Sequence, residues 1–170
     1  MFFLYFCNTY NYNMGDHHTI TELLLLTYPI LLGLGSAFVL VPKKGIQRRC
    51  GSVPSIQPPS WVFYIVWPIM YCLIGVAGYV YYKKNGFTGT LVYFIAATLL
   101  LIGWWIIFNK ICYPKAAFAC LVVITAMFLT LYCIFARGES RLASWLTAPL
   151  ICWLYFACYL VYITIKDTAV

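Results

Sequence analysis

Five long apolar runs, separated by short polar segments, dominate the chain. They cover residues 19–41, 61–82, 88–108, 116–136 and 142–165. A helix needs roughly 20 apolar residues to cross the hydrocarbon core of a membrane, whereas a spanning strand needs only about 9–11 residues of alternating polarity. Because lipid offers the backbone no hydrogen-bond partner, we expect an all-α integral membrane bundle of five transmembrane helices over residues 19–167. Residues 1–18 form a polar tail rich in Tyr and Asn.

Composition agrees with a membrane protein. Of the 170 residues, 64% are hydrophobic and 9% are charged, whereas a soluble domain carries about 25% charged residues. The net charge of +7 does not indicate a nucleic-acid partner, because the basic residues stand singly or in pairs between apolar runs, as in loops at the surface of a lipid bilayer. The eight cysteines form no CxxC pair, so we expect neither a disulfide framework nor a metal site.

Aromatic side chains recur at intervals of four within three of the runs, so they share helix faces. The groups on these faces are Phe63, Trp67 and Tyr71; Trp104 and Phe108; and Trp145, Pro149, Trp153 and Ala157. Brought together, the three faces would wall a cavity that suits a flat, largely apolar ligand, although ordinary helix packing explains the same spacing. Trp61 and Trp145, near the ends of their runs, are typical of the interfacial aromatic belt.

Proline and glycine bear on how the helices meet. Pro68 and Pro149 each lack the N–H that would bond one turn back, so each frees a backbone carbonyl, which a neighbouring helix or a cavity must satisfy. Gly33 and Ala37 are small residues four apart, a spacing that permits close helix approach within one chain or between two. The long first loop, residues 42–60, is either a plain linker or a lid.

The segment VPSIQPPSWVFYIVWPIMYCLIG, from Val53 to Gly75, resembles the signature of the TspO/MBR family. These are the translocator proteins, known as peripheral benzodiazepine receptors in mitochondria and tryptophan-rich sensory proteins in bacteria. The family pattern is roughly K-P-S-x-x-P-P-x-W-V-F-x-P-V-W-x-x-L-Y-x-x-M-G. The matching positions are Pro54, Ser55, Pro58, Pro59, Trp61, Val62, Phe63, Val66, Trp67, Tyr71 and Gly75. Looser matches are Trp104 and Phe108 in the third run, and Pro149, Trp153, Phe156 and Ala157 in the fifth.

The resemblance implies a dimeric five-helix protein of the mitochondrial outer membrane or of a bacterial membrane. It implies binding of porphyrins such as protoporphyrin IX, and of sterols or drug-like aromatic molecules, in transport, sensing or regulation. The alternative is an enzyme that degrades porphyrin under light. The chain offers no acid–base pair, activated nucleophile or metal cluster, so we expect binding rather than catalysis, with porphyrin as a ligand and no required cofactor. The implied ligand-binding residues are Pro58, Pro59, Trp67, Tyr71, Trp104, Phe108, Trp153 and Ala157.

A sterol-recognition pattern of the type L/V–Y–K/R is met by Leu160, Tyr162 and Lys166. Lys166 also has a simpler explanation, because a Lys at the end of an apolar span can extend its side chain to the lipid headgroups. Among the departures from the family pattern, Val53 stands where Lys is usual and Leu101 where Asn is usual. These changes remove polar groups from the expected pocket.

Basic residues are unequally divided between the two sides of a five-span protein. The side with the first loop and the C-terminus holds seven: Lys43, Lys44, Arg48, Arg49, Lys110, Lys115 and Lys166. The other side holds four: Lys83, Lys84, Arg137 and Arg141. By the positive-inside rule, this bias predicts that the C-terminus and the first loop face the cytosol.

A cysteine added in a C-terminal tag tests this orientation. In membranes that are otherwise intact, the tag should react with a thiol reagent applied from the cytosolic side, because the more basic loops stay on that side. If the tag is protected from that reagent, the C-terminus lies on the opposite side of the membrane and the predicted orientation is wrong.

Overall fold

The structure, a computed structural model, describes residues 19–35, 56, 58–111, 113–138 and 140–167. All regular structure in these ranges is helical. The helices are Thr19–Gly35 (the first helix), α2 (Ser60–Asn85), α3 (Gly89–Ile106), the π-helix η2 (Ile107–Ile111), α4 (Pro114–Arg137) and α5 (Arg141–Asp167). The expected all-α class is therefore confirmed for the described part of the chain.

Four of these helices, α2 to α5, are long and apolar enough to cross a membrane. They begin and end within about one helical turn of the predicted boundaries. The first helix is apolar but shorter, because residues 36–41 of the predicted span 19–41 lie outside the described residues. Within the described residues, the structure thus supports a multi-pass membrane protein with four candidate spans and a shorter apolar first helix, so the five-span prediction is confirmed in part.

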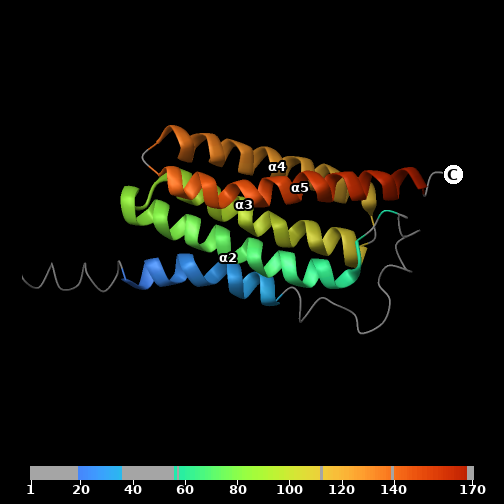
Figure 1. Cartoon of the computed structure of the whole chain (residues 1–170), viewed down its shortest axis with the longest axis horizontal. Coiled ribbons are helices and arrows are strands. Elements are labelled where there is room, and N and C mark those ends of the chain that lie inside the picture. Colours follow the sequence, from blue (N-terminus) through green and yellow to red (C-terminus); the bar gives the residue numbers. More distant parts are fainter. Residues whose placement is uncertain (1–18, 36–55, 57, 112, 139, 168–170) are drawn as a thin grey trace, which may run out of the picture.

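The helices lie side by side in one bundle, with consecutive helices antiparallel (Figure 1). The most extensive contact is between α4 and α5, and α5 also packs against α2. A tight turn at Gly86, whose φ of 70° favours glycine, connects α2 to α3. The hydroxyls of Tyr81 and Thr88 lie 3.2 Å apart across this turn. Near the same end of the bundle, Lys83 of α2 and Glu22 of the first helix approach to 3.8 Å.

Two glycines allow the first helix and α2 to pack closely. A side chain at Gly33 would overlap the ring of Tyr71, and a Cβ at Gly75 would lie 2.6 Å from the backbone oxygen of Leu26. Gly33 therefore serves packing within the chain. Its predicted companion Ala37 lies outside the described residues. Close approach of these two helices depends on the absence of side chains at both contacts.

Replacement of Gly75 by Ala tests this contact. The new methyl group meets a backbone oxygen, which cannot swing aside, so the two helices must separate. We expect Gly75→Ala to destabilise the protein by about 1–3 kcal/mol, seen as a lower midpoint of thermal unfolding in detergent.

Gly103→Ala in α3 is the matched control, because a Cβ at Gly103 meets nothing within 4 Å. An alanine in that helix interior should be neutral or slightly stabilising. If Gly75→Ala unfolds no earlier than Gly103→Ala, the close approach to Leu26 does not contribute to stability.

Candidate functional site

Seven aromatic side chains from α2, the α3–η2 segment and α5 form one connected group, here called the aromatic cluster. Its members are Phe63, Trp67, Tyr71, Trp104, Phe108, Trp153 and Phe156. All three helix faces that were singled out by their spacing in the sequence contribute to it. The juxtaposition of these faces is thus a property of the fold.

Trp67 lies at the centre of the aromatic cluster. Its ring centroid is 5.7 Å from that of Trp104 and 6.2 Å from that of Trp153, the latter at an interplanar angle of 86°. Tyr71, one turn further along α2, lies 5.9 Å away. Centroid distances of about 4.5–7 Å are those of rings in direct contact. Trp67 therefore joins α2 to both α3 and α5.

The π-helix η2 carries one member of the cluster. Trp104 lies in the last turn of α3, and Phe108 follows it within η2. Their rings are stacked, with centroids 6.0 Å apart and planes 16° from parallel. The apolar pattern predicted a plain helix to residue 108, because a π turn has no signature in hydropathy. Such turns are rare and often occur at functional sites.

Two members, Phe63 and Phe156, were absent from the predicted ligand-binding set. Phe63 contacts Trp153 edge-on at 5.6 Å, and Phe156 lies 5.4 Å from the same indole. Both could have been included from their spacing, because Phe63 is four residues before Trp67 and Phe156 is three after Trp153. Spacing along the sequence does not reveal that Phe63 of α2 contacts Trp153 of α5.

The remaining predicted site residues occupy different surroundings. Ala157 is buried on α5, one turn beyond Trp153. Pro58 and Pro59 immediately precede α2, the first half-buried and the second exposed. The loop residues 42–55 and 57, which we expected to act as a lid or a linker, lie outside the described residues.

The tryptophans divide by exposure as their positions in the sequence suggest. Trp61 and Trp145 are 62% and 70% exposed, whereas Trp104 is 7% exposed. Trp67 and Trp153 are intermediate. The outer pair suits an interfacial belt, and the inner three belong to the aromatic cluster.

Two indole nitrogens in the aromatic cluster are buried without hydrogen-bond acceptors. These are Nε1 of Trp104 and Nε1 of Trp153, neither of which has a partner among the described residues. A buried donor without an acceptor costs free energy of roughly 1–3 kcal/mol. The cluster is therefore an apolar surface that also offers two N–H groups to an acceptor.

The residues of the sterol pattern do not share one face of α5. Leu160 is buried in the bundle, whereas Tyr162 is 54% exposed and Lys166 is exposed. The Tyr162 ring lies 6.3 Å from that of Phe118 on α4. Tyr162 and Lys166 thus lie on the outer surface, away from the side of α5 that carries Leu160.

Cysteine and acidic side chains do not add a second site to the described ranges. Cys72, Cys120, Cys133, Cys152 and Cys158 are free thiols there. Within the same ranges, no three His, Cys, Asp or Glu side chains are close enough to hold a metal ion. The Thr125 hydroxyl and the Cys158 thiol lie 3.8 Å apart across the α4–α5 contact.

The fold is that of a multi-pass helical membrane protein, and three of its tryptophans, Trp67, Trp104 and Trp153, meet in one cluster. A profile of the TspO/MBR family matches residues 23–165. The chain is also 32% identical over 150 residues to "Tryptophan-rich protein TspO" of Chlorobaculum tepidum, an alignment that covers 80% of this chain and 92% of that relative. The chain belongs to the TspO/MBR family, which confirms the resemblance seen in its sequence.

Proposed function

We propose that this protein binds porphyrins of the protoporphyrin IX type at the aromatic cluster. The observation that carries the proposal is the convergence of Trp67, Trp104 and Trp153 from three helices on one connected surface. Family membership supports it, and so does the flat apolar shape of a tetrapyrrole, which suits stacking on aromatic rings. Binding would serve transport, sensing or regulation, in a dimer whose C-terminus faces the cytosol.

The geometry restricts how a porphyrin can be held. The cluster rings already touch one another, so a ligand must lie against their outer faces or enter as an indole turns aside. The buried N–H groups of Trp104 and Trp153 have no partner among the described residues. An acceptor on the ligand, such as a propionate carboxylate, would satisfy them. A hydrogen bond to a charged acceptor is roughly twice as strong as one between neutral groups.

Porphyrin degradation under light is the competing function. In that case the reaction would rely on the photochemistry of the bound ligand and on the tryptophans near it. The two functions differ in one measurement, since a pure binding protein returns porphyrin unchanged after illumination. Incubation of purified protein with protoporphyrin IX in darkness and in light, with affinity and products followed together, distinguishes them.

The inner tryptophans should contribute more to porphyrin affinity than the outer pair. Stacking of a base on an aromatic side chain contributes about 1–3 kcal/mol, and we take the same scale for a porphyrin face. Trp67→Leu or Trp153→Leu should then weaken binding by about five- to a hundredfold. Fluorescence quenching by protoporphyrin IX, measured in darkness on full-length protein, gives the affinities.

Trp61→Leu and Trp145→Leu are the matched controls, because they remove the same side chain from exposed positions. Trp153→Phe separates two effects, since it keeps an aromatic face and removes only the N–H donor. Intermediate affinity for Trp153→Phe would assign part of the binding to that donor. If inner and outer substitutions lower porphyrin affinity equally, the tryptophans act only as membrane anchors and the proposal is wrong.

A sterol, if bound, would contact the outer surface formed by Tyr162, Lys166 and Phe118. Tyr162 offers a hydroxyl on an exposed ring that lies against the half-buried ring of Phe118, and Lys166 can reach the headgroups. Leu160 is excluded from this surface by its burial. We therefore confine the sterol proposal to these three side chains.

Tyr162→Phe should lower the photo-crosslinking yield of a sterol probe, because it removes one hydroxyl whose net contribution is about 1 kcal/mol. Porphyrin affinity at the inner tryptophans should hardly change. A crosslinking yield that survives both Tyr162→Phe and Lys166→Ala would leave these residues as ordinary membrane anchors.

A further inference from the structure

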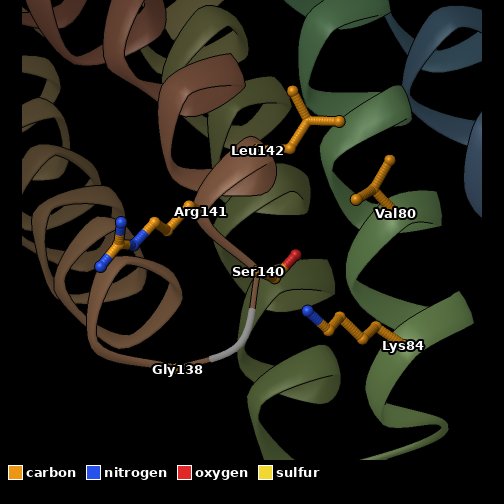
Figure 2. Close-up of a pocket in the computed structure, with 6 residues that line it drawn as sticks. All are labelled: Val80, Lys84, Gly138, Ser140, Arg141 and Leu142. Carbon is orange, nitrogen blue, oxygen red and sulfur yellow. The ribbon is translucent and has the colours of Figure 1, made fainter.

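A cavity opens at the end of α2 that is remote from the aromatic cluster. It has a volume of about 480 Å³ and lies between α2 and the turn from α4 to α5 (Figure 2). Its lining residues are Val80, Lys84, Gly138, Ser140, Arg141 and Leu142. The volume is in the range of small-molecule sites, about 300–1,000 Å³. The cavity shares no residue with the aromatic cluster.

Ser140 is the unusual member of this lining. It is 3% exposed, and its Oγ has no hydrogen-bond partner among the described residues. The other buried Ser and Thr hydroxyls of the described ranges all donate to a backbone carbonyl one turn earlier in their helices. These are Thr98, Thr125, Ser144, Thr147 and Thr164. A buried hydroxyl without a protein partner can hydrogen-bond to a group that enters the cavity.

The cavity also lies at the N-terminus of a long helix. The Ser140 carbonyl accepts a bond from the Ser144 N–H at 3.3 Å, so Ser140 is the cap of α5. The N–H groups of the first turn have no partner within the helix, and the aligned peptide dipoles make this end positive. A cap serine usually accepts one of these N–H bonds, but the Ser140 Oγ does not.

Charge reinforces this polarity. Figure 2 shows the Lys84 amino group directed toward Ser140, whereas the Arg141 guanidinium extends away over α4. The first turn of α5 has no acidic residue, and a basic Arg141 at that position is unfavourable for the helix dipole. Glu22, the nearest described carboxylate at this end, is engaged with Lys83. Glu139 lies outside the described residues.

We propose that this cavity binds the phosphate of an anionic phospholipid headgroup. Phosphate is the group that helix N-termini and lysine bind well, and Ser140 can donate its hydroxyl to a phosphate oxygen. The cavity lies at the ends of the candidate spans Trp61–Asn85 and Arg141–Lys166, the level at which headgroups lie. Val80 and Leu142 supply apolar contacts for the glycerol and the upper acyl chain.

Native mass spectrometry of the full-length protein, titrated with phosphatidylglycerol in detergent, measures the affinity for the first bound lipid. Ser140→Ala and Lys84→Gln should each weaken it by about tenfold, because each removes a hydrogen bond to a charged oxygen. Arg141→Gln should weaken it less, since that guanidinium points away from the cavity. Phosphatidylcholine, which has no net charge, should bind more weakly than phosphatidylglycerol to the unmodified chain.

Lys83→Gln is the matched control, because it removes the same charge from the neighbouring residue, which is outside the lining. Equal losses from Lys83→Gln and Lys84→Gln would show attraction to surface charge alone and overturn the proposal. Inorganic phosphate or glycerol 3-phosphate that displaces the lipid at similar concentration would assign the site to a soluble phosphate instead. That result would overturn the lipid assignment.

Thermal unfolding in nanodiscs shows whether a variant that binds less lipid is still folded. Ser140 Oγ makes no capping bond, so Ser140→Ala should unfold with the unmodified chain in phosphatidylcholine alone. Added phosphatidylglycerol should raise the unfolding midpoint of the unmodified chain and leave that of Ser140→Ala nearly unchanged. An equal rise in both proteins would contradict the site.

Discussion

The requirement that every backbone polar group find a partner away from water determines most of this structure. In lipid only a helix satisfies its own N–H and C=O groups, so the apolar runs become helices whatever their local propensities. The same requirement extends to side chains. Thr98, Thr125 and Thr147, all buried, donate to carbonyls of their own helices. These hydroxyls therefore need no partner on another helix, and the contacts between helices depend mainly on shape and on aromatic rings.

Once the helices are self-satisfied, their arrangement depends on close packing rather than on hydrophobic burial, because the lipid outside is as apolar as the core. Gly33 and Gly75 let the first helix and α2 approach without intervening side chains. Tyr71 fills the space at Gly33 and also contacts Trp67, at 5.9 Å. The docking of the first helix is therefore connected through one side chain to the centre of the aromatic cluster. A side chain added at Gly33 would displace Tyr71, itself a member of the aromatic cluster, and through Tyr71 it would disturb Trp67.

Much of this could be predicted from the sequence, and what could not has physical causes. Hydropathy and length predicted five spans, and four of them are long apolar helices in the described residues, because both signals follow from the thickness of the bilayer. The spacing of four placed Trp67, Trp104 and Trp153 on helix faces, since that periodicity is a property of the single helix. The pairing of those faces depends on how helices rotate against one another, so the contact of Phe63 with Trp153 was not foreseen. The π turn at Phe108 and the cavity at Ser140 depend on backbone detail that composition does not encode.

Unsatisfied polar atoms are the exception in such a structure, which makes their positions informative. Four buried side-chain polar atoms lack a hydrogen bond within the described ranges: the Tyr28 hydroxyl, Nε1 of Trp104, Nε1 of Trp153 and Oγ of Ser140. The Tyr28 hydroxyl lies close to that of Thr98. The other three lie in the aromatic cluster and in the cavity at the α5 N-terminus, at different levels of the bundle. Each leaves a buried donor without a protein acceptor, which costs free energy. An acceptor bound at either place would recover that cost, which is why both binding proposals are placed at these atoms.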